Sequence, residues 1–168
     1  GAVLVKDRAK LYAAFSAHAD YLQDVLDAVE ELSSADLSPE LTRHFRGLRL
    51  WLPLKVLGVA PFRAALSEKI HLARYFYEQI QKIDGFEVGP YPDLSVVTYR
   101  YLPKRGDPDE FNQRLMGAVQ DGGRIFVSST RVDGAFVLRA AIVCFRTHLD
   151  DVDEALEVLS RTAQELEN

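Results

Sequence analysis

The sequence predicts an α+β protein, in which a small antiparallel four-stranded sheet has helices packed on one face and follows a helical N-terminal arm. Two observations support this fold class. After Gly85 the spacing of apolar residues changes from the helical period of about 3.6 to the strand period of two. From there to the C-terminus the segments follow the order strand, strand, helix, strand, strand, helix, which is typical of a sheet covered by helices.

The N-terminal arm begins with a short apolar run. Residues 1–5, GAVLV, are typical of a buried strand, although no partner strand follows nearby. Residues 6–15 have helical spacing, and so do the apolar residues of the segment 22–32. The arm is therefore predicted to be one unpaired strand followed by helices.

Two longer helices are predicted before the sheet. The first covers 41–57 and is apolar on most sides, so it should be buried; Pro53 should kink or break it, and Gly58 can end it. The second covers 61–83. Its predicted buried stripe consists of Phe62, Leu66, Ile70, Ala73, Tyr77 and Ile80.

The sheet and its helices are predicted over residues 86–167. Strands are expected at 86–88, 94–102, 124–130 and 135–145, with helices at 107–120 and 148–167. The sequence RVDG, residues 131–134, is a hairpin signal between the third and fourth strands. The fourth strand is apolar on both faces and should be central. Arg139 within it should then be buried with a structural partner, and Cys144 should be an inert core residue.

Composition excludes several classes of protein. The chain has 168 residues, 48% of them hydrophobic and 27% charged, and its net charge of −5 argues against a nucleic-acid partner. No apolar run approaches the roughly 20 residues that span a bilayer, and no signal peptide is visible. A single cysteine fits a reducing compartment, so we expect a cytoplasmic protein. The lone methionine is Met116, so we expect the N-terminus to arise by trimming of a longer chain.

Few residues indicate chemistry by their pattern alone. No histidine is spaced as a metal pair with another histidine or with the cysteine, and no nucleophile or phosphate-loop motif occurs. Arg43, Arg46 and Arg49 step by three along the apolar helix, either as a solvated stripe or as donors to a carboxylate, a phosphate or a loop. Tyr21, among small and acidic residues, is by itself an aromatic residue beside a helix start. The residues alone give no complete catalytic constellation.

Four segments nevertheless resemble one enzyme family. They are GAVLVKDRAKLYAAF at 1–15, DYLQD at 20–24, LTRHFRGLRLW at 41–51 and FVLRAAIVCFRTHLDDVD at 136–153, and they extend from one end of the chain to the other. In this order they resemble the C-terminal part of the pyridoxal-phosphate-dependent group II amino-acid decarboxylases. The similarity is closest to the aromatic-L-amino-acid branch and its bacterial relatives.

The resemblance implies a division of the chain into parts of a larger fold. That family has a large α/β domain that holds pyridoxal phosphate and a small C-terminal α+β domain. Residues 1–40 would be the end of the large domain with its catalytic loop, 41–83 would be linking helices, and 84–168 would be the small domain. The strand predicted at 1–5 would belong to the large domain's sheet.

The resemblance also implies an activity and roles for specific residues. Tyr21 matches the catalytic-loop tyrosine, which would reach into the other subunit of a homodimer and protonate the α carbon of a small L-amino acid after carbon dioxide leaves. Retention of this tyrosine implies a decarboxylase and not an aldehyde synthase. Arg43, Arg46 and Arg49 would support the loop or the dimer interface, and Arg139 would be structural.

Two departures from the family pattern limit what this chain can do alone. His44 replaces the second arginine of the family's RRFR segment. None of the chain's lysines follows a histidine, as the cofactor lysine of the family does; they are Lys6, Lys10, Lys55, Lys69, Lys82 and Lys104. The cofactor would therefore be bound by an upstream N-terminal part of the enzyme, and this chain alone would be inactive. The alternative is a non-catalytic α+β interaction or regulatory module.

Overall fold

The structure is a computed structural model that describes residues 4–15, 37–38 and 44–167. The chain forms two compact units, 1–56 and 57–168. The first contains helix α1 (Arg8–Phe15) and nearly all of helix α3 (Leu48–Leu57). Neither of these two helices has a buried residue, so within the described residues neither is part of a hydrophobic core.

The first unit differs from the sequence prediction at several points. Leu4 and Val5, the described residues of the predicted first strand, lie outside any strand, and Leu4 is fully exposed. Helix α3 starts at Leu48 and not at 41, because the backbone turns just before it. Pro53 lies inside α3 without ending it, since the helix continues to Leu57. Gly58, with a φ of +75°, ends it as predicted.

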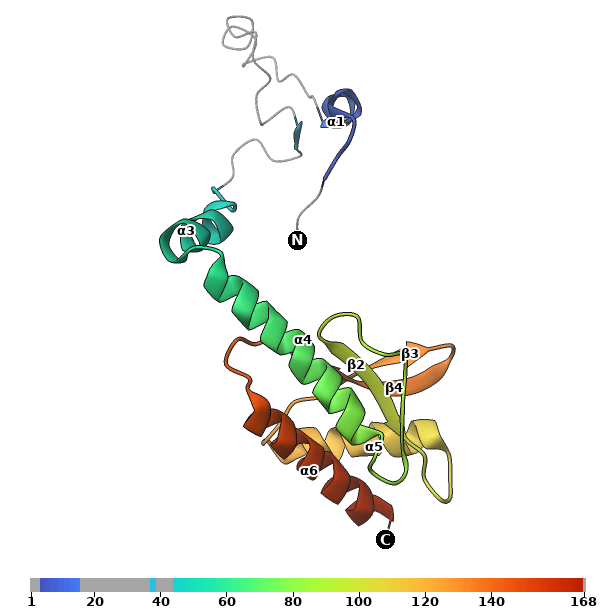
Figure 1. The fold of residues 1–168 in the computed structure, drawn as a ribbon. Helices are drawn as coiled ribbons and strands as arrows, with labels where there is room; N and C mark the ends of the chain where they lie inside the picture. Colours follow the sequence, from blue (N-terminus) through green and yellow to red (C-terminus); the bar gives the residue numbers. More distant parts are fainter. Residues whose placement is uncertain (1–3, 16–36, 39–43, 168) are drawn as a thin grey trace, which may run out of the picture. The chain divides into compact units, whose positions relative to one another are not determined.

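The second unit contains strands and helices in the predicted order, and a long helix precedes them (Figure 1). Its sheet has the order β1-β2-β4-β3, and all neighbouring strands are antiparallel. The elements are α4 (Ala60–Ile80), β1 (Phe86–Val88), β2 (Val96–Tyr101), α5 (Pro108–Asp121), β3 (Ser128–Val132), β4 (Ala135–Ala141) and α6 (Leu149–Glu167). The α+β fold class with a four-stranded antiparallel sheet is therefore confirmed within the described residues.

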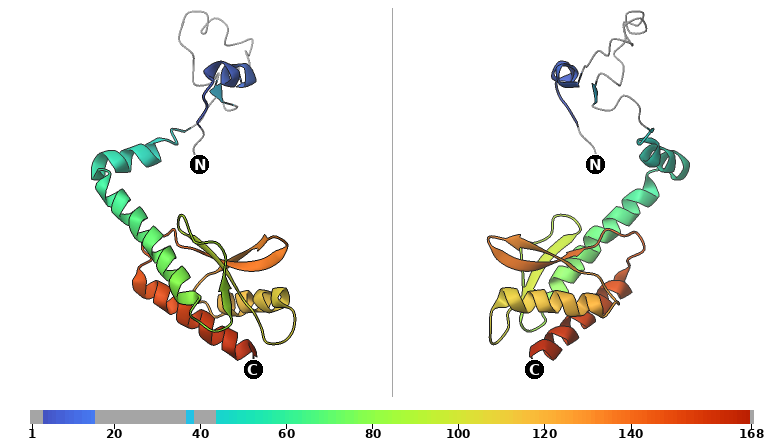
Figure 2. Two further views of the ribbon diagram at one scale, coloured as in Figure 1. Left: turned by 45° about the vertical axis from the view of Figure 1, so that its right-hand side comes forward. Right: turned by 180° about the vertical axis from the view of Figure 1, so that it is seen from behind.

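Helices α4, α5 and α6 all lie on one face of the sheet (Figure 2). Phe111, Leu115 and Val119 of α5 are buried. Asn112 is also fully buried, and its amide donates to the Tyr101 carbonyl and accepts from the Tyr101 amide, both at 2.8 Å. It satisfies backbone groups that would otherwise be buried without a partner. The core therefore forms between one sheet face and three helices.

The buried stripe of α4 is rotated from the predicted one. Ala73 and Ile80 are buried as expected, but Leu66 is 66% exposed. The observed stripe still follows helical spacing and consists of Lys69, Leu72, Ala73, Phe76 and Ile80. One of its members is a charged side chain. By length and composition no single described helix could cross a membrane, and only α3 and α4 taken together as a broken pair reach the required length and apolarity.

The hairpin of β3 and β4 confirms the turn and corrects two predictions. Asp133 and Gly134 both have positive φ, 50° and 83°, as a two-residue hairpin turn requires. Strand β4 is central but ends at Ala141, and among the described residues of the second unit the helices lie on one face of its sheet. Arg139 is consequently exposed and not buried; its Nε donates to the Ser128 hydroxyl at 3.1 Å. Cys144 lies beyond the strand and is exposed, so it is not a core residue.

Candidate functional site

The predicted catalytic and interface residues fall in or next to the first unit. Tyr21 and Arg43 lie outside the described residues. Arg46 lies in the turn before α3, whereas Arg49 lies on α3, and both are exposed. The helix prediction for 41–57 placed all three arginines on one helix face. That arrangement is wrong for Arg46, because the helix begins only at Leu48.

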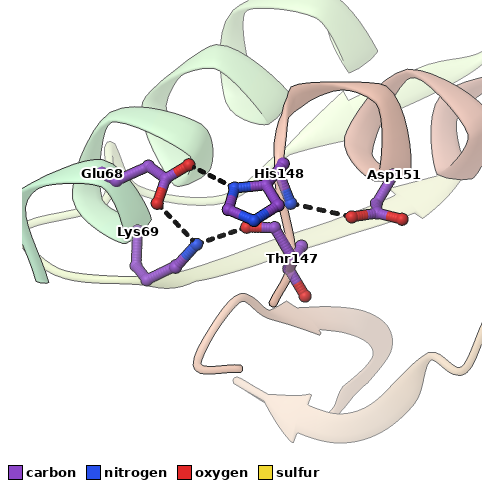
Figure 3. Close-up of polar contacts among 5 residues, drawn as sticks. All are labelled: Glu68, Lys69, Thr147, His148 and Asp151. Carbon is purple, nitrogen blue, oxygen red and sulfur yellow. Dashed lines mark hydrogen bonds and ion pairs between the residues drawn. The ribbon is translucent and has the colours of Figure 1, made fainter. Parts of the chain in front are cut away.

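A polar cluster in the second unit joins α4 to the start of α6 (Figure 3). The Nζ atom of Lys69 donates to Glu68 Oε2 at 3.0 Å and to the backbone carbonyl of Thr147. The other carboxylate oxygen of Glu68 lies 2.7 Å from Nδ1 of His148. The backbone amide of His148 donates to Asp151 Oδ2 at 2.8 Å, which caps the first turn of α6. Residues about 80 positions apart are thus held together.

Burial of the Lys69 ammonium gives this cluster its physical importance. The side chain is 5% exposed, whereas those of Glu68 and His148 are 39% and 63% exposed. A buried ammonium is costly unless it is paired and hydrogen-bonded. Here one carboxylate oxygen and one carbonyl oxygen supply those contacts. The position of the loop at Thr147 is therefore tied to the satisfaction of a buried charge.

The two partners of Glu68 hold its carboxyl group in the ionised form. The hydrogen bond from His148, and then that from Lys69, lower the pKa of Glu68 below its usual value of 4.5. A carboxyl whose pKa is lowered by folding stabilises the folded state above the pKa of the unfolded chain. That stabilisation is lost as the pH falls through the folded-state pKa.

This linkage predicts the behaviour of a Glu68→Gln variant. The free energy of unfolding of the original protein should fall as the pH drops below 4.5, and that of the variant should fall less steeply, because glutamine does not titrate. Urea unfolding across the acid range measures the difference. Asp109, whose pKa is lowered by the Phe136 amide and then by Arg131, titrates in both proteins and cancels. The control is Glu78→Gln, an exposed position on α4. Parallel curves for the Glu68 variant and the original would refute the coupling.

Two tyrosines of the second unit, Tyr99 and Tyr75, do not offer an alternative acid. Tyr99 is buried, its hydroxyl has no hydrogen-bond partner among the described residues, and burial raises its pKa far above the usual value. The hydroxyl of Tyr75 donates to Asp153 Oδ1 at 2.7 Å, and this hydrogen bond raises its pKa. Neither hydroxyl is poised to give a proton to a substrate near neutral pH.

All six lysines of the chain lie in the described residues. Lys69 is committed to Glu68 and Thr147, and the other lysines are exposed on the surface. No group of three or more metal-ligating side chains occurs in the described ranges either. The polar cluster fixes a loop and the start of a helix. The role of the cluster is therefore to hold the loop at Thr147 and the start of α6 in position against α4.

Sequence reasoning gave no role to Glu68 or Lys69, and His148 entered it only as the first residue of the predicted helix 148–167. One signal for Lys69 was present, since it lies at the helical spacing of the buried residues that follow it on α4. The partners could not be inferred in the same way. Glu68 and His148 are 80 positions apart, and only the docking of α6 on α4 brings them together.

Comparison with known proteins assigns the family. Residues 1–102 match the model of the pyridoxal-dependent decarboxylase conserved domain. Tyrosine decarboxylase 2 of Arabidopsis thaliana is 32% identical over 95% of this chain and 30% of its own length. Phenylacetaldehyde synthase of Petunia hybrida is 29% identical over 95% of this chain and 34% of its own length.

A solved structure gives the same answer for the fold. The chain is similar to the crystal structure of Oryza sativa TDC with PLP and tryptamine, with a TM-score of 0.87 and 29% identity. The match covers 98% of this chain and 35% of the chain in the crystal structure. The chain spans about a third of the length of the proteins it matches. The family-model match covers more than half of the 168 residues. The chain belongs to the pyridoxal-dependent decarboxylase family.

Proposed function

We propose that this chain acts as the C-terminal part of a pyridoxal-phosphate-dependent carboxy-lyase, which converts an L-amino acid to its amine and carbon dioxide. The observation that carries the proposal is the end-to-end similarity to proteins about three times as long, together with the family match over residues 1–102. The cofactor and its lysine belong to the upstream part, since no lysine of this chain follows a histidine as the family's cofactor lysine does.

The catalytic contribution of this chain is Tyr21. After carbon dioxide leaves, the α carbon must receive a proton on the correct face, and a phenol hydroxyl held close to it can deliver that proton. The loop around Tyr21 reaches the active site of the other subunit in a two-fold homodimer and excludes water when it closes. The cofactor, when bound, supplies the electron sink for decarboxylation.

The exposed surface of α3 supports the dimer. Leu50, Trp51 and Val56 are 66%, 56% and 70% exposed, and Phe45 just before the helix is 72% exposed. Large apolar side chains in such density are typical of obligate interfaces, which resemble a hydrophobic core divided between two subunits. We assign Arg43, Arg46 and Arg49 to the support of this interface or of the catalytic loop.

We take the domain boundaries from the resemblance of this chain to the decarboxylase family. Residues 1–40 belong to the end of the large domain, 41–83 to the linking helices, and 84–168 to the small domain. In the described residues, Arg139 donates a hydrogen bond to the Ser128 hydroxyl of the neighbouring strand, which supports a structural role for this arginine. We place the enzyme in the cytoplasm, where a chain with a single cysteine finds reducing conditions.

The relatives favour an aromatic L-amino acid as the first substrate to test. One is named a tyrosine decarboxylase, and the rice structure contains tryptamine. A second reaction class is supported by the Petunia relative, which is named phenylacetaldehyde synthase and is similar over the same share of the chain. We favour amine formation because Tyr21 retains the hydroxyl that protonates the α carbon.

The non-catalytic module remains the competing hypothesis, and one experiment separates the two. Purified full-length protein is reduced with borohydride in the presence of pyridoxal phosphate, denatured, and digested for mass spectrometry. The proposal expects one reduced cofactor on a lysine upstream of Gly1, with none of the six lysines of this chain labelled. A stoichiometric label on one of those six lysines refutes the proposed cofactor site. A protein with no label at all supports the module.

A further inference from the structure

A hollow in the second unit lies where the loop between β2 and α5 meets the C-terminal end of α6. Its volume is about 300 Å³. That volume lies at the lower end of the range of small-molecule sites, about 300–1,000 Å³. We call its lining residues the basic pocket, and they are Lys104, Arg105, Phe111, Arg114, Leu166 and Glu167.

The charges of the basic pocket favour an anion. Lys104, Arg105 and Arg114 carry three positive charges and Glu167 carries one negative charge, so the lining has a net charge of +2. The protein as a whole has a net charge of −5, so this positive charge is local. A phosphate group attached to an organic molecule carries about −1.5 to −2 charges at neutral pH. It therefore matches the lining better than a single carboxylate does.

Arg114 is held over an aromatic pair that belongs to the core. The carbon at the centre of its guanidinium group lies 5.4 Å from the centroid of the Phe111 ring, within the range of a cation–π interaction. Phe111 is 2% exposed, and its ring stacks on that of Tyr101 with centroids 5.0 Å apart. Arg114 forms no ion pair with a carboxylate of the described residues. Its guanidinium is thus positioned and still available to a ligand.

Contacts with α6 position the loop that carries the other two cations. The backbone amide of Lys104 donates to Glu167 Oε1 at 3.0 Å, and Lys104 Nζ lies 4.0 Å from Glu167 Oε2. The Glu167 side chain is 12% exposed, whereas that of Lys104 is 89% exposed. The carboxylate therefore fixes the backbone of the loop and leaves the ammonium open to a ligand. Arg105, the next residue, is exposed and has no ion-pair partner within the described ranges.

The apolar part of the lining indicates a ligand larger than a free ion. Phe111 and Leu166 contribute apolar atoms to the pocket. An inorganic ion gains nothing from apolar surface, whereas an organic group attached to the phosphate can cover it and remove it from water. The small volume of the pocket favours a small molecule as the source of the phosphate.

We propose that the basic pocket binds the phosphate group of a small organic phosphate ester. Arg105 and Arg114 donate hydrogen bonds to the phosphate oxygens through their planar guanidinium groups, and Lys104 adds a third positive charge. Leu166 contacts the organic part of the ligand. The proposal is independent of the proposed enzymatic function, because it uses residues of the second unit alone.

Phenyl phosphate is the probe for this site. Full-length protein is first saturated with pyridoxal phosphate and desalted, and is then titrated with phenyl phosphate in a calorimeter at constant ionic strength. We expect one phenyl phosphate per chain, with a dissociation constant on the order of 1 mM or below. Arg114→Gln should raise that constant at least about tenfold, because it removes a charge-assisted hydrogen-bond donor. Inorganic phosphate and benzoate should each bind at least about tenfold more weakly than phenyl phosphate.

Two further variants separate the pocket from a general effect of charge. Arg161→Gln removes the same charge from an exposed position of α6 outside the basic pocket and should leave binding unchanged. Glu167→Gln keeps an oxygen that can accept from the Lys104 amide but removes the negative charge, so it should strengthen binding.

Three results would overturn the proposal. The first is the absence of phenyl phosphate binding in the millimolar range. The second is binding that Arg114→Gln leaves unchanged, because the ligand then lies elsewhere on the protein. The third is equal affinity for phenyl phosphate and for inorganic phosphate or benzoate, because the pocket then does not select an organic phosphate. Since calorimetry measures binding directly, none of these results bears on whether the enzyme forms an amine.

Discussion

Replacing Tyr21 by phenylalanine in the full-length enzyme should lower the rate of amine formation by about 10²–10⁴-fold, the usual contribution of a positioned general acid. The substitution removes only the hydroxyl, so substrate binding and loss of carbon dioxide should persist. Without the proposed proton donor, the enzyme should release a larger share of its product as the aldehyde, formed by oxidation with dissolved dioxygen and water, which releases ammonia and hydrogen peroxide. Amine, aldehyde and carbon dioxide are quantified together from the same reaction.

The control for this substitution is Tyr12→Phe, which removes a hydroxyl from a half-buried tyrosine on α1. It should leave the product ratio unchanged. An unchanged amine rate in the Tyr21 variant would remove the residue from the mechanism. Loss of carbon dioxide release together with amine formation would indicate that Tyr21 acts before decarboxylation and not as the acid that follows it.

Replacing Trp51 by aspartate should dissociate the proposed dimer. A tryptophan at the centre of an interface typically contributes at least about 2 kcal/mol, so the dissociation constant should rise at least about 30-fold. Helix α3 has no buried residue in the chain itself, so the core of the second unit should remain intact. Activity should fall with the dimer fraction, since Tyr21 is proposed to act in the other subunit. Sedimentation and rate measurements over a range of concentrations test both effects.

Two outcomes would contradict this interface. One is a Trp51→Asp variant that remains a dimer at concentrations where the original enzyme begins to dissociate. The other is a monomeric variant that retains full activity at low concentration. Trp51→Phe, which keeps a large apolar aromatic side chain, should retain both the dimer and the activity, and it separates the loss of apolar contact in Trp51→Asp from a general effect of substitution at this position.

Much of the second unit could be predicted because its local signals agree with its tertiary structure. The period of two over β2 places Val97, Tyr99 and Tyr101 on the covered face. The Asp107 side chain accepts the amide of Glu110 at 3.0 Å and starts α5, as an Asp-Pro pair before an amphipathic run predicts. Such signals need no knowledge of distant parts of the chain.

Two failed predictions in the second unit concern how elements pack. The sequence of β4 is apolar on both faces, yet the three helices cover only one face in the described residues, so Arg139 is exposed. Which stripe of α4 is buried depends on its rotation against the sheet and α6. That rotation buries Lys69 and exposes Leu66, which a scale of hydrophobicity alone would reverse.

The candidate site also combines features that local sequence predicts with features that depend on tertiary packing. The similarity of four ordered segments indicates the family and identifies Tyr21 as the candidate proton donor. This was possible because the residues that carry the similarity around Tyr21 are neighbours in the sequence. The contacts of Lys69 with Thr147 and of Glu68 with His148 depend on tertiary packing across about 80 residues. Sequence spacing cannot reveal them.

The most direct test of the central claim is a subunit-mixing experiment. Subunits carrying Tyr21→Phe are unfolded and refolded together with subunits that lack the upstream cofactor lysine. If Tyr21 serves the active site of the other subunit, each mixed dimer has one complete site, and random pairing restores about a quarter of the original activity. If Tyr21 serves its own subunit, neither site of the mixed dimer is complete. The mixture then stays as inactive as its two components, and that result would contradict the account.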